Sequence, residues 1–185
     1  MKTLVLYTSM TGSTEKYAHD IANAVGGEAF SLKTFSWRKI DDYGIVIYGG
    51  WIMGGTIQGL NKFFQHWDKS LKNKNVIIFS VGMTIPTAEG RHLLIEQNLL
   101  DLYHVRYYQV RGSFDINKLH FPYKFMINNS IKMAVNDPNA SEDQKSLALV
   151  KDHPIEVYDN EKIEKILTVV RSIESAPVEV KEESK

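Results

Sequence analysis

The sequence predicts a doubly wound α/β domain, in which helices cover both faces of a parallel sheet. Short runs rich in Val and Ile, at residues 3–7, 45–48 and 76–81, are typical of strands that are buried on both faces. Segments with helical spacing separate these runs, so strands and helices alternate along the chain. This order of elements favours one doubly wound sheet, which binds ligands at the carboxyl ends of its strands.

Five strands and four helices account for most of the chain. The strands are expected at residues 3–7, 28–32, 45–48, 76–81 and 106–110. The second strand is shorter and more polar than the others, which indicates a position near the edge of the sheet. The spaced residues that mark the helices are Tyr17, Ile21, Ala22 and Val25; Leu60, Phe63, Phe64 and Trp67; Leu93, Leu94, Gln97 and Leu100; and Ile163, Ile166, Leu167, Val170 and Ile173.

Two segments depart from this alternation. Residues 113–160 stand where a short connection between the fifth strand and the last helix would suffice, and long connections of this kind are usually functional or mobile. Residues 175–185 contain Pro177 and alternating charges with little to bury, so we expect a disordered tail. We interpret the chain as a single domain, residues 1–174, with an insertion at about 113–160.

Composition excludes several classes of function. Lys plus Arg total 22 and Asp plus Glu total 22, so no global field recruits nucleic acid. The chain has no Cys, which excludes disulfides and thiolate chemistry, and its six His lack the spacing of metal ligands. The first apolar run is too short for a signal peptide, and no run approaches the roughly 20 residues of a membrane-spanning helix. We expect a cytoplasmic protein that needs a bound cofactor for any redox chemistry.

The loop after the first strand is rich in hydroxyl side chains. Residues 7–16 read YTSMTGSTEK, with no charge before the ninth position. Backbone N–H groups at a helix N-terminus, supplemented by hydroxyls, bind a phosphate without a formal positive charge. The hydroxyl donors expected here are Ser9, Thr11, Ser13 and Thr14. Alternatively, Ser13 or Thr14 only caps a helix that starts near Glu15, and the residues before it only form a turn.

The loop resembles the phosphate loop of flavodoxins, S-x-T-G-x-T, which is complete here as Ser9-Met10-Thr11-Gly12-Ser13-Thr14. The resemblance covers residues 1–112 and 161–174. It implies a flavodoxin-like sheet of five parallel strands in the order 2-1-3-4-5, and FMN bound through its 5′-phosphate in this loop, with no necessary part for Lys16. The first turn lacks the motifs G-x-G-x-x-G and Gly-Lys-Ser/Thr, so NAD and ATP are not expected as the principal ligand.

The same resemblance places the flavin ring between the loops after the third and fourth strands. The candidates in the first loop are Gly49, Gly50, Trp51, Ile52, Met53 and Gly54. In flavodoxin-like proteins a peptide of this loop flips to bond flavin N5, so Gly49, Gly50, Gly54 or Gly55 is expected at the flipping site. Trp51 either stacks on the ring or anchors the core. The second loop offers Gly82, Met83 and Thr84, without the Tyr that flavodoxins often place over the flavin.

The insertion begins with an acid-free segment, residues 117–136, that carries three Lys. If Pro122 occupies the first turn, one face of an amphipathic helix is lined by Tyr123, Met126, Ile127, Ile131 and Ala134. This face packs against the protein's own sheet or a partner in a homodimer, or else it forms a membrane-surface or quinone-binding contact. The sequence leaves both interpretations open.

Three functions are compatible with these features. The placement of the insertion resembles that in the menaquinone-dependent protoporphyrinogen dehydrogenases, which implies an FMN-dependent oxidoreductase that passes electrons to a quinone. A second is a flavodoxin-type electron carrier that docks to a redox partner protein, although flavodoxins are strongly acidic and this chain is neutral. A third is a non-catalytic flavin-binding interaction protein. No side chain is predicted to be catalytic, because the flavin carries the chemistry.

Overall fold

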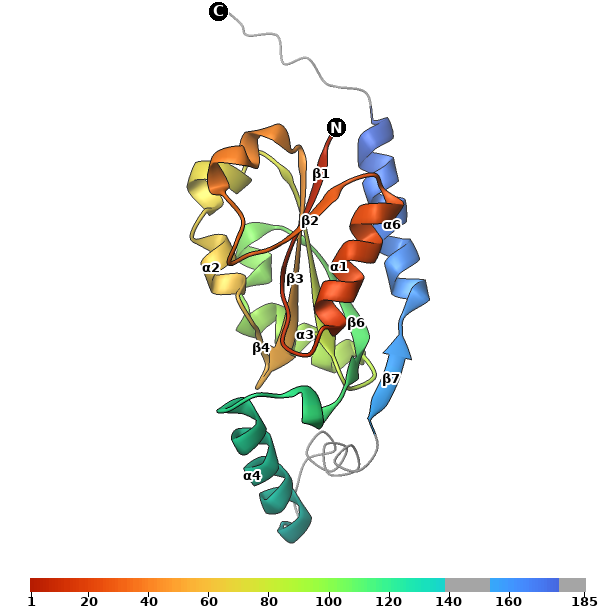
Figure 1. The fold of residues 1–185 in the computed structure, drawn as a ribbon. Helices are drawn as coiled ribbons and strands as arrows, with labels where there is room; N and C mark the ends of the chain where they lie inside the picture. Colours follow the sequence, from red (N-terminus) through yellow and green to blue (C-terminus); the bar gives the residue numbers. More distant parts are fainter. Residues whose placement is uncertain (139–153, 177–185) are drawn as a thin grey trace, which may run out of the picture.

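A five-stranded parallel sheet forms the centre of the computed structural model, which describes residues 1–138 and 154–176 (Figure 1). Its strands lie in the order β2 (Glu28–Ser31), β1 (Thr3–Thr8), β3 (Ile45–Met53), β5 (Asn75–Gly82) and β6 (Arg106–Phe114). When only these five parallel strands are numbered along the chain, their order in the sheet is 2-1-3-4-5. The predicted doubly wound sheet is therefore confirmed. Two further strands were not expected: β4 (Thr56–Ile57) pairs antiparallel with β3, and β7 (Ile155–Tyr158) pairs antiparallel with β6.

Helices cover both faces of the sheet. One face carries α1 (Ser13–Ala24) and α6 (Asn160–Ser175), which lie next to each other in Figure 1. The other face carries η1 (Trp37–Asp42), α2 (Leu60–Phe64), η2 (Trp67–Leu71), α3 (Ala88–Gln97) and η3 (Leu100–Tyr103). The helix expected from Leu60 to Trp67 is therefore divided into α2 and the π-helical turn η2. The insertion contributes η4 (Ile116–Lys118) and α4 (Tyr123–Asn136).

Two hydrophobic clusters, one on each face, hold the sheet and its helices together. In β1, Leu4 and Leu6 point into the cluster under α2 and α3, whereas Val5 and Tyr7 point into the cluster under α1 and α6. Successive side chains of a strand point to opposite faces, so a strand buried on both faces needs apolar residues at every position. This requirement explains the continuous apolar runs in the sequence.

Several boundaries differ from those expected. The strand β3 continues to Met53 instead of ending near Tyr48. The strand β6, which is the expected fifth strand, extends to Phe114 and so into the expected insertion. The predicted insertion helix is present as α4, with Pro122 just before its first residue. The remainder of the insertion, residues 139–153, and the predicted tail from residue 177 onward lie outside the described residues.

Candidate functional site

The loops that follow β1, β3, β5 and β6 meet at one edge of the sheet, because the carboxyl ends of parallel strands lie together (Figure 1). The insertion elements η4 and α4 lie beyond the same edge. The predicted cofactor residues at 9–14, 49–54 and 82–84 all belong to these loops or to the ends of the strands and the helix that flank them. The edge is therefore the candidate site.

The loop after β1 turns sharply into α1. Gly12 has a φ of +94°, a left-handed conformation that favours glycine, and its N–H donates to Ser9 Oγ over 3.2 Å. Gly12, and not Ser13 or Thr14 as expected, is the N-cap residue, and no side chain caps the helix. Among the described residues, the backbone N–H groups of Ser13, Thr14 and Glu15 have no hydrogen-bond acceptor. These donors can bind an anion.

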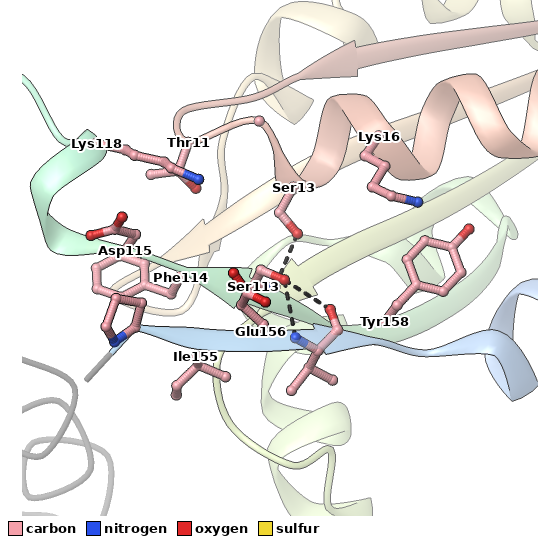
Figure 2. Close-up of a pocket in the computed structure, with 13 residues that line it drawn as sticks. Thr11, Ser13, Lys16, Ser113, Phe114, Asp115, Lys118, Ile155, Glu156 and Tyr158 are labelled. Carbon is pink, nitrogen blue, oxygen red and sulfur yellow. Dashed lines mark hydrogen bonds between the residues drawn. The ribbon is translucent and has the colours of Figure 1, made fainter.

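The four predicted hydroxyl residues have different surroundings. Thr14 is buried, while Thr11 and Ser13 line a pocket of about 530 Å³ (Figure 2). Ser9 Oγ accepts the bond from Gly12, and Ser13 Oγ accepts a bond of 3.1 Å from the backbone N–H of Ser113. A hydroxyl that accepts one hydrogen bond keeps its proton for donation. Ser9 and Ser13 can therefore still donate to an anion in the loop.

The pocket also contains charged residues that sequence reasoning did not assign to the site. Its other charged lining residues are Lys16, Asp115, Lys118 and Glu156. Lys16 Nζ lies 2.7 Å from Asp20 Oδ2 and 4.0 Å from the centre of the Tyr158 ring. Burial favours a higher pKa for Asp20, but the hydrogen bonds from Lys16 and Tyr158 outweigh it and lower that pKa overall. Lys16 is thus engaged with its neighbours at the rim of the loop.

Tyr7 is a neutral neighbour of the loop. Its hydroxyl donates to Glu15 Oε1 over 2.7 Å, at the first turn of α1. Burial, followed by the hydrogen bond to Glu15, raises the pKa of Tyr7 to about 12. The side chain therefore stays protonated at neutral pH and contributes no charge of its own to the site.

The glycine-rich segment after Tyr48 is mostly strand, which corrects the expected loop. Gly49 and Gly50 lie within β3 and pair with β1 on one side and β5 on the other. An added Cβ would overlap the Phe79 ring at Gly49 and would lie 2.6 Å from Ile57 Cγ2 at Gly50. These two glycines are required by the packing of the protein itself, and neither peptide can flip without breaking the ladder.

The turn of this segment lies at Gly54 and Gly55, which join β3 to β4. Both have positive φ, +56° and +76°, as a two-residue hairpin turn requires. Asn98 fixes the second half of the turn, because its Nδ2 donates to Gly55 O and its Oδ1 accepts from Ile57 N, each over 2.8 Å. A Cβ at Gly54 would have no neighbour within 4 Å, so Gly54 keeps its place as the candidate for a flipping peptide.

The three remaining candidates of β3 face different surroundings. Trp51 is partly exposed and meets Tyr123 of α4 edge to face, with ring centres 5.7 Å apart and planes at 83°. Ile52 packs on the core cluster under α3, and Met53 pairs with Thr56 in the hairpin. Trp51 is therefore the aromatic side chain that the predicted ring site shares with the insertion.

The loop after β5 supplies the second predicted ring contact. Gly82 ends β5, and Met83 and Thr84 follow at the same edge, partly exposed. Arg111 of β6 donates from Nε to Met83 O over 3.0 Å and so fixes the course of this loop. Sequence reasoning missed Arg111, because no local pattern links it to a residue that precedes it by 28 positions.

The insertion packs onto the candidate site. Ile116, Leu119 and Ile131 form a small buried cluster, and Met10 of the phosphate loop packs against it. Ile127 and Ile131, two residues expected on the apolar face of α4, therefore pack within the protein itself, in a cluster that Met10 of the loop joins. Met126, expected on that buried face, is 49% exposed instead.

Two further properties of the described ranges 1–138 and 154–176 bear on function. No helix in them is long and apolar enough to cross a membrane. Within the same residues, no three His, Asp or Glu side chains come together as metal ligands would.

The chain is similar to one protein family and to several solved structures. The model of the flavodoxin domain family matches residues 4–141, whereas no curated protein matches the chain. One similar solved structure is a flavodoxin from the domain Archaea, with 15% identity over 60% of this chain and 83% of that chain and a TM-score of 0.44. A second is a putative flavoprotein from Bacteroides eggerthii, with 17% identity over 82% of this chain and 96% of that chain and a TM-score of 0.44. A third is oxidised flavodoxin 2 from Bacillus cereus, with 17% identity over 80% of this chain and 94% of that chain and a TM-score of 0.45. At these identities and TM-scores the likeness carries no information on ligand or activity. Because the family match spans more than half of the sequence, the chain belongs to the flavodoxin domain family.

Proposed function

We propose that the protein binds FMN at the carboxyl edge of its sheet, with the 5′-phosphate in the loop of residues 9–14. The uncapped start of α1 carries this proposal, since the N–H groups of Ser13, Thr14 and Glu15 have no acceptor among the described residues. These donors suit the terminal oxygens of a phosphate, and the helix dipole favours its charge. Membership of the flavodoxin domain family supports the same cofactor.

FMN, when bound, supplies the one-electron and two-electron redox chemistry that this chain, which has no Cys, lacks. The protein's own residues bind and orient it. Thr11 and Ser13 donate O–H groups beside the backbone amides, while Trp51, Gly54 and the segment 82–84 border the place expected for the ring. Tyr123 contacts Trp51 and so extends the border of the ring site into the insertion, where it would limit access to the flavin ring.

For the activity, we favour an oxidoreductase with a quinone acceptor, similar to the menaquinone-dependent protoporphyrinogen dehydrogenases, over a flavodoxin-type carrier. A carrier needs an open edge of the flavin against which a partner protein docks. Here Tyr123 of α4 lies against Trp51 at that edge, and Ile131 of α4 belongs to the cluster that Met10 of the loop joins. A substrate that approaches the ring would therefore contact the insertion. The neutral net charge also gives a basic redox partner little attraction.

We further propose that the outer surface of the insertion contacts an anionic membrane surface, where a quinone is available. Phe121, Phe125 and Met133 are 83%, 60% and 72% exposed, and Lys132 is exposed between them. Exposed aromatic and basic side chains together favour the boundary of anionic headgroups. Sedimentation with anionic vesicles, but not with zwitterionic ones, is the expected result, and Phe121→Ser with Phe125→Ser should abolish it. Equal recovery with both vesicle types would contradict the contact.

Cofactor binding is tested by the visible spectrum of the purified protein after incubation with FMN and removal of the excess. We expect a flavin spectrum at a stoichiometry near one. Thr11→Ala should weaken FMN binding about 10- to 100-fold, since a hydrogen bond to a charged group is worth about 1.5–3 kcal/mol. Thr168→Ala, in α6, is the matched control and should bind as the unmodified protein does. Absence of flavin from the unmodified protein would overturn the proposal.

The activity is tested by anaerobic oxidation of protoporphyrinogen with a menaquinone analogue as acceptor. Saturable turnover that depends on FMN is the result expected of the dehydrogenase. Bound flavin without turnover, combined with rapid electron exchange with a flavodoxin reductase, would instead favour the carrier.

A further inference from the structure

We propose that Lys118, which the insertion places at the phosphate loop, is a binding residue for the cofactor phosphate. The phosphate loop motif itself contributes no positive charge, so in this chain the insertion would complete the site electrostatically. The inference rests on the proposed FMN binding and names a residue that neither the motif nor the family match points to.

The position of Lys118 is fixed by the residues on either side of it. Ile116 and Leu119 are each 5% exposed and pack with Met10 of the loop, so η4 lies directly against the loop. Asp115 caps this turn, since its Oδ1 accepts from the N–H of Asn117 over 2.8 Å. Lys118, between two anchored residues, therefore cannot move far from the loop without breaking the small cluster.

The side chain of Lys118 is exposed and extends toward the loop. It lines the same pocket as Thr11, Gly12 and Ser13, and Figure 2 shows it extended from η4 toward Thr11. No ion pair of Lys118 is present among the described residues, whereas Lys16, the other cation of the pocket, is paired with Asp20. Lys118 is thus the pocket cation that remains available to an incoming anion.

The charges of the pocket make this cation favourable for phosphate binding. Asp115 and Glu156 also line it, and the charge of Lys16 is largely balanced by Asp20. Without Lys118, a phosphate dianion would enter a lining with two carboxylates and no unbalanced cation, and like charges at this range repel. With Lys118 present, the phosphate gains a charge-assisted hydrogen bond. The effect is electrostatic, so it should weaken as salt is added.

The test compares FMN with riboflavin, which has the same ring and ribityl chain but no phosphate. Dissociation constants are measured by quenching of flavin fluorescence for the unmodified chain, Lys118→Gln, Lys118→Arg and Lys132→Gln. Lys132 lies on the same insertion, is exposed, and does not line the pocket, so its variant is the matched control. We expect Lys118→Gln to weaken FMN binding about 10-fold at low salt and to leave riboflavin binding unchanged. Lys118→Arg should restore most of the difference.

Two results would overturn the role of Lys118. One is FMN binding that Lys118→Gln leaves unchanged, and the other is an equal loss for FMN and riboflavin, which would indicate a purely structural role. If the unmodified chain bound no FMN, the proposed function would fail. The same variants are then titrated with inorganic phosphate, following the amide resonances of residues 11–15. Phosphate-induced chemical-shift changes that become smaller only in Lys118→Gln would support an anion site that includes Lys118. Changes of the same size in Lys118→Gln, or no changes in the unmodified chain, would contradict that site.

Discussion

The central sheet and the insertion at its carboxyl edge are stabilised in different ways. The strands β1, β3 and β5 are buried on both faces, between two large hydrophobic clusters that involve every helix packed on the sheet. The described part of the insertion has a cluster of three buried residues, Ile116, Leu119 and Ile131, and it uses Met10 of the phosphate loop as a further contact. A cluster of this size supports little independent stability.

The phosphate loop has two roles in this arrangement: it offers donors to an anion, and it holds the insertion. One side of the loop presents uncapped amides of α1, while Met10 and Ser13 hold the insertion by packing and by a hydrogen bond to Ser113. The insertion should therefore open locally with a lower free energy than the sheet. Any ligand that orders the loop should also order the insertion, because the insertion contacts the loop through Met10 and Ser13.

The largest effect is expected in the sheet, for Gly49→Ala. A Cβ at this position would overlap the ring of Phe79, which is fully buried between two strands and cannot move away. We expect the free energy of unfolding in urea to fall by about 3 kcal/mol, as overpacking in a close-packed core does. Phe79→Leu in the same chain should recover part of the loss by removing the ring. A fall below 0.5 kcal/mol, roughly the size of a surface substitution, would show that the sheet is less tightly packed than described.

The next largest effect is expected in the pH dependence of the free energy of unfolding, through a buried pair of hydroxyls in the sheet. The hydroxyls of Ser80 and Tyr107 lie 2.7 Å apart in the core. Burial raises the pKa of Tyr107 to about 12, although the bond to Ser80 and the charge of Arg91 oppose the rise. The raised pKa contributes stability that is complete below the unfolded-state pKa of about 10 and is lost as pH rises toward the folded-state value.

The double variant Tyr107→Phe with Ser80→Ala removes this pair without leaving an unpaired hydroxyl. Its free energy of unfolding should fall less between pH 8 and pH 11 than that of the unmodified chain, by about 1 kcal/mol. Urea unfolding at both pH values measures the difference. An identical fall in both proteins would mean that Tyr107 is accessible to water and that the sheet opens at β6.

The smallest global effect is expected in the insertion, for Ile131→Ala. The substitution removes one of three buried residues, so the insertion should open more often while the sheet stays folded. We expect limited proteolysis within residues 117–136 to become about 5-fold faster, which corresponds to a fall of about 1 kcal/mol in the free energy of local opening. The free energy of global unfolding in urea should change by less than about 0.5 kcal/mol. Val135→Ala, at a position that is 70% exposed, is the control. A large drop in global stability would show that the insertion belongs to the core.

The sequence predicted the sheet well because burial on both faces leaves a direct trace, an unbroken run of apolar residues. It also located the loop at 9–14, since the tight turn and the helix start depend on neighbouring residues. The sequence did not show that Gly49 and Gly50 lie within β3, because a glycine indicates a close approach but not its partner, which at Gly49 is Phe79 of the neighbouring strand.

The charges of the pocket could not be predicted either. Lys118 and Gly12 line the same pocket although 106 positions of sequence separate them, and the packing of η4 with Met10 holds η4 beside the loop. The acid-free run at 117–136 was visible, but nothing in it indicated which Lys faces the loop. β7 pairs with β6 through only two register positions, Gly112 with Tyr158 and Phe114 with Ile155, and such short edge pairing gives little signal in a sequence.

Amide hydrogen exchange of the full chain, with and without saturating FMN, measures whether the cofactor orders both the phosphate loop and the insertion. A ligand that binds the phosphate loop stabilises the segments it contacts and those that depend on them. We predict the strongest slowing at residues 9–16, clear slowing at residues 115–136 through Met10 and Lys118, and little change within β5. FMN that binds without slowing exchange at residues 9–16 would contradict the account.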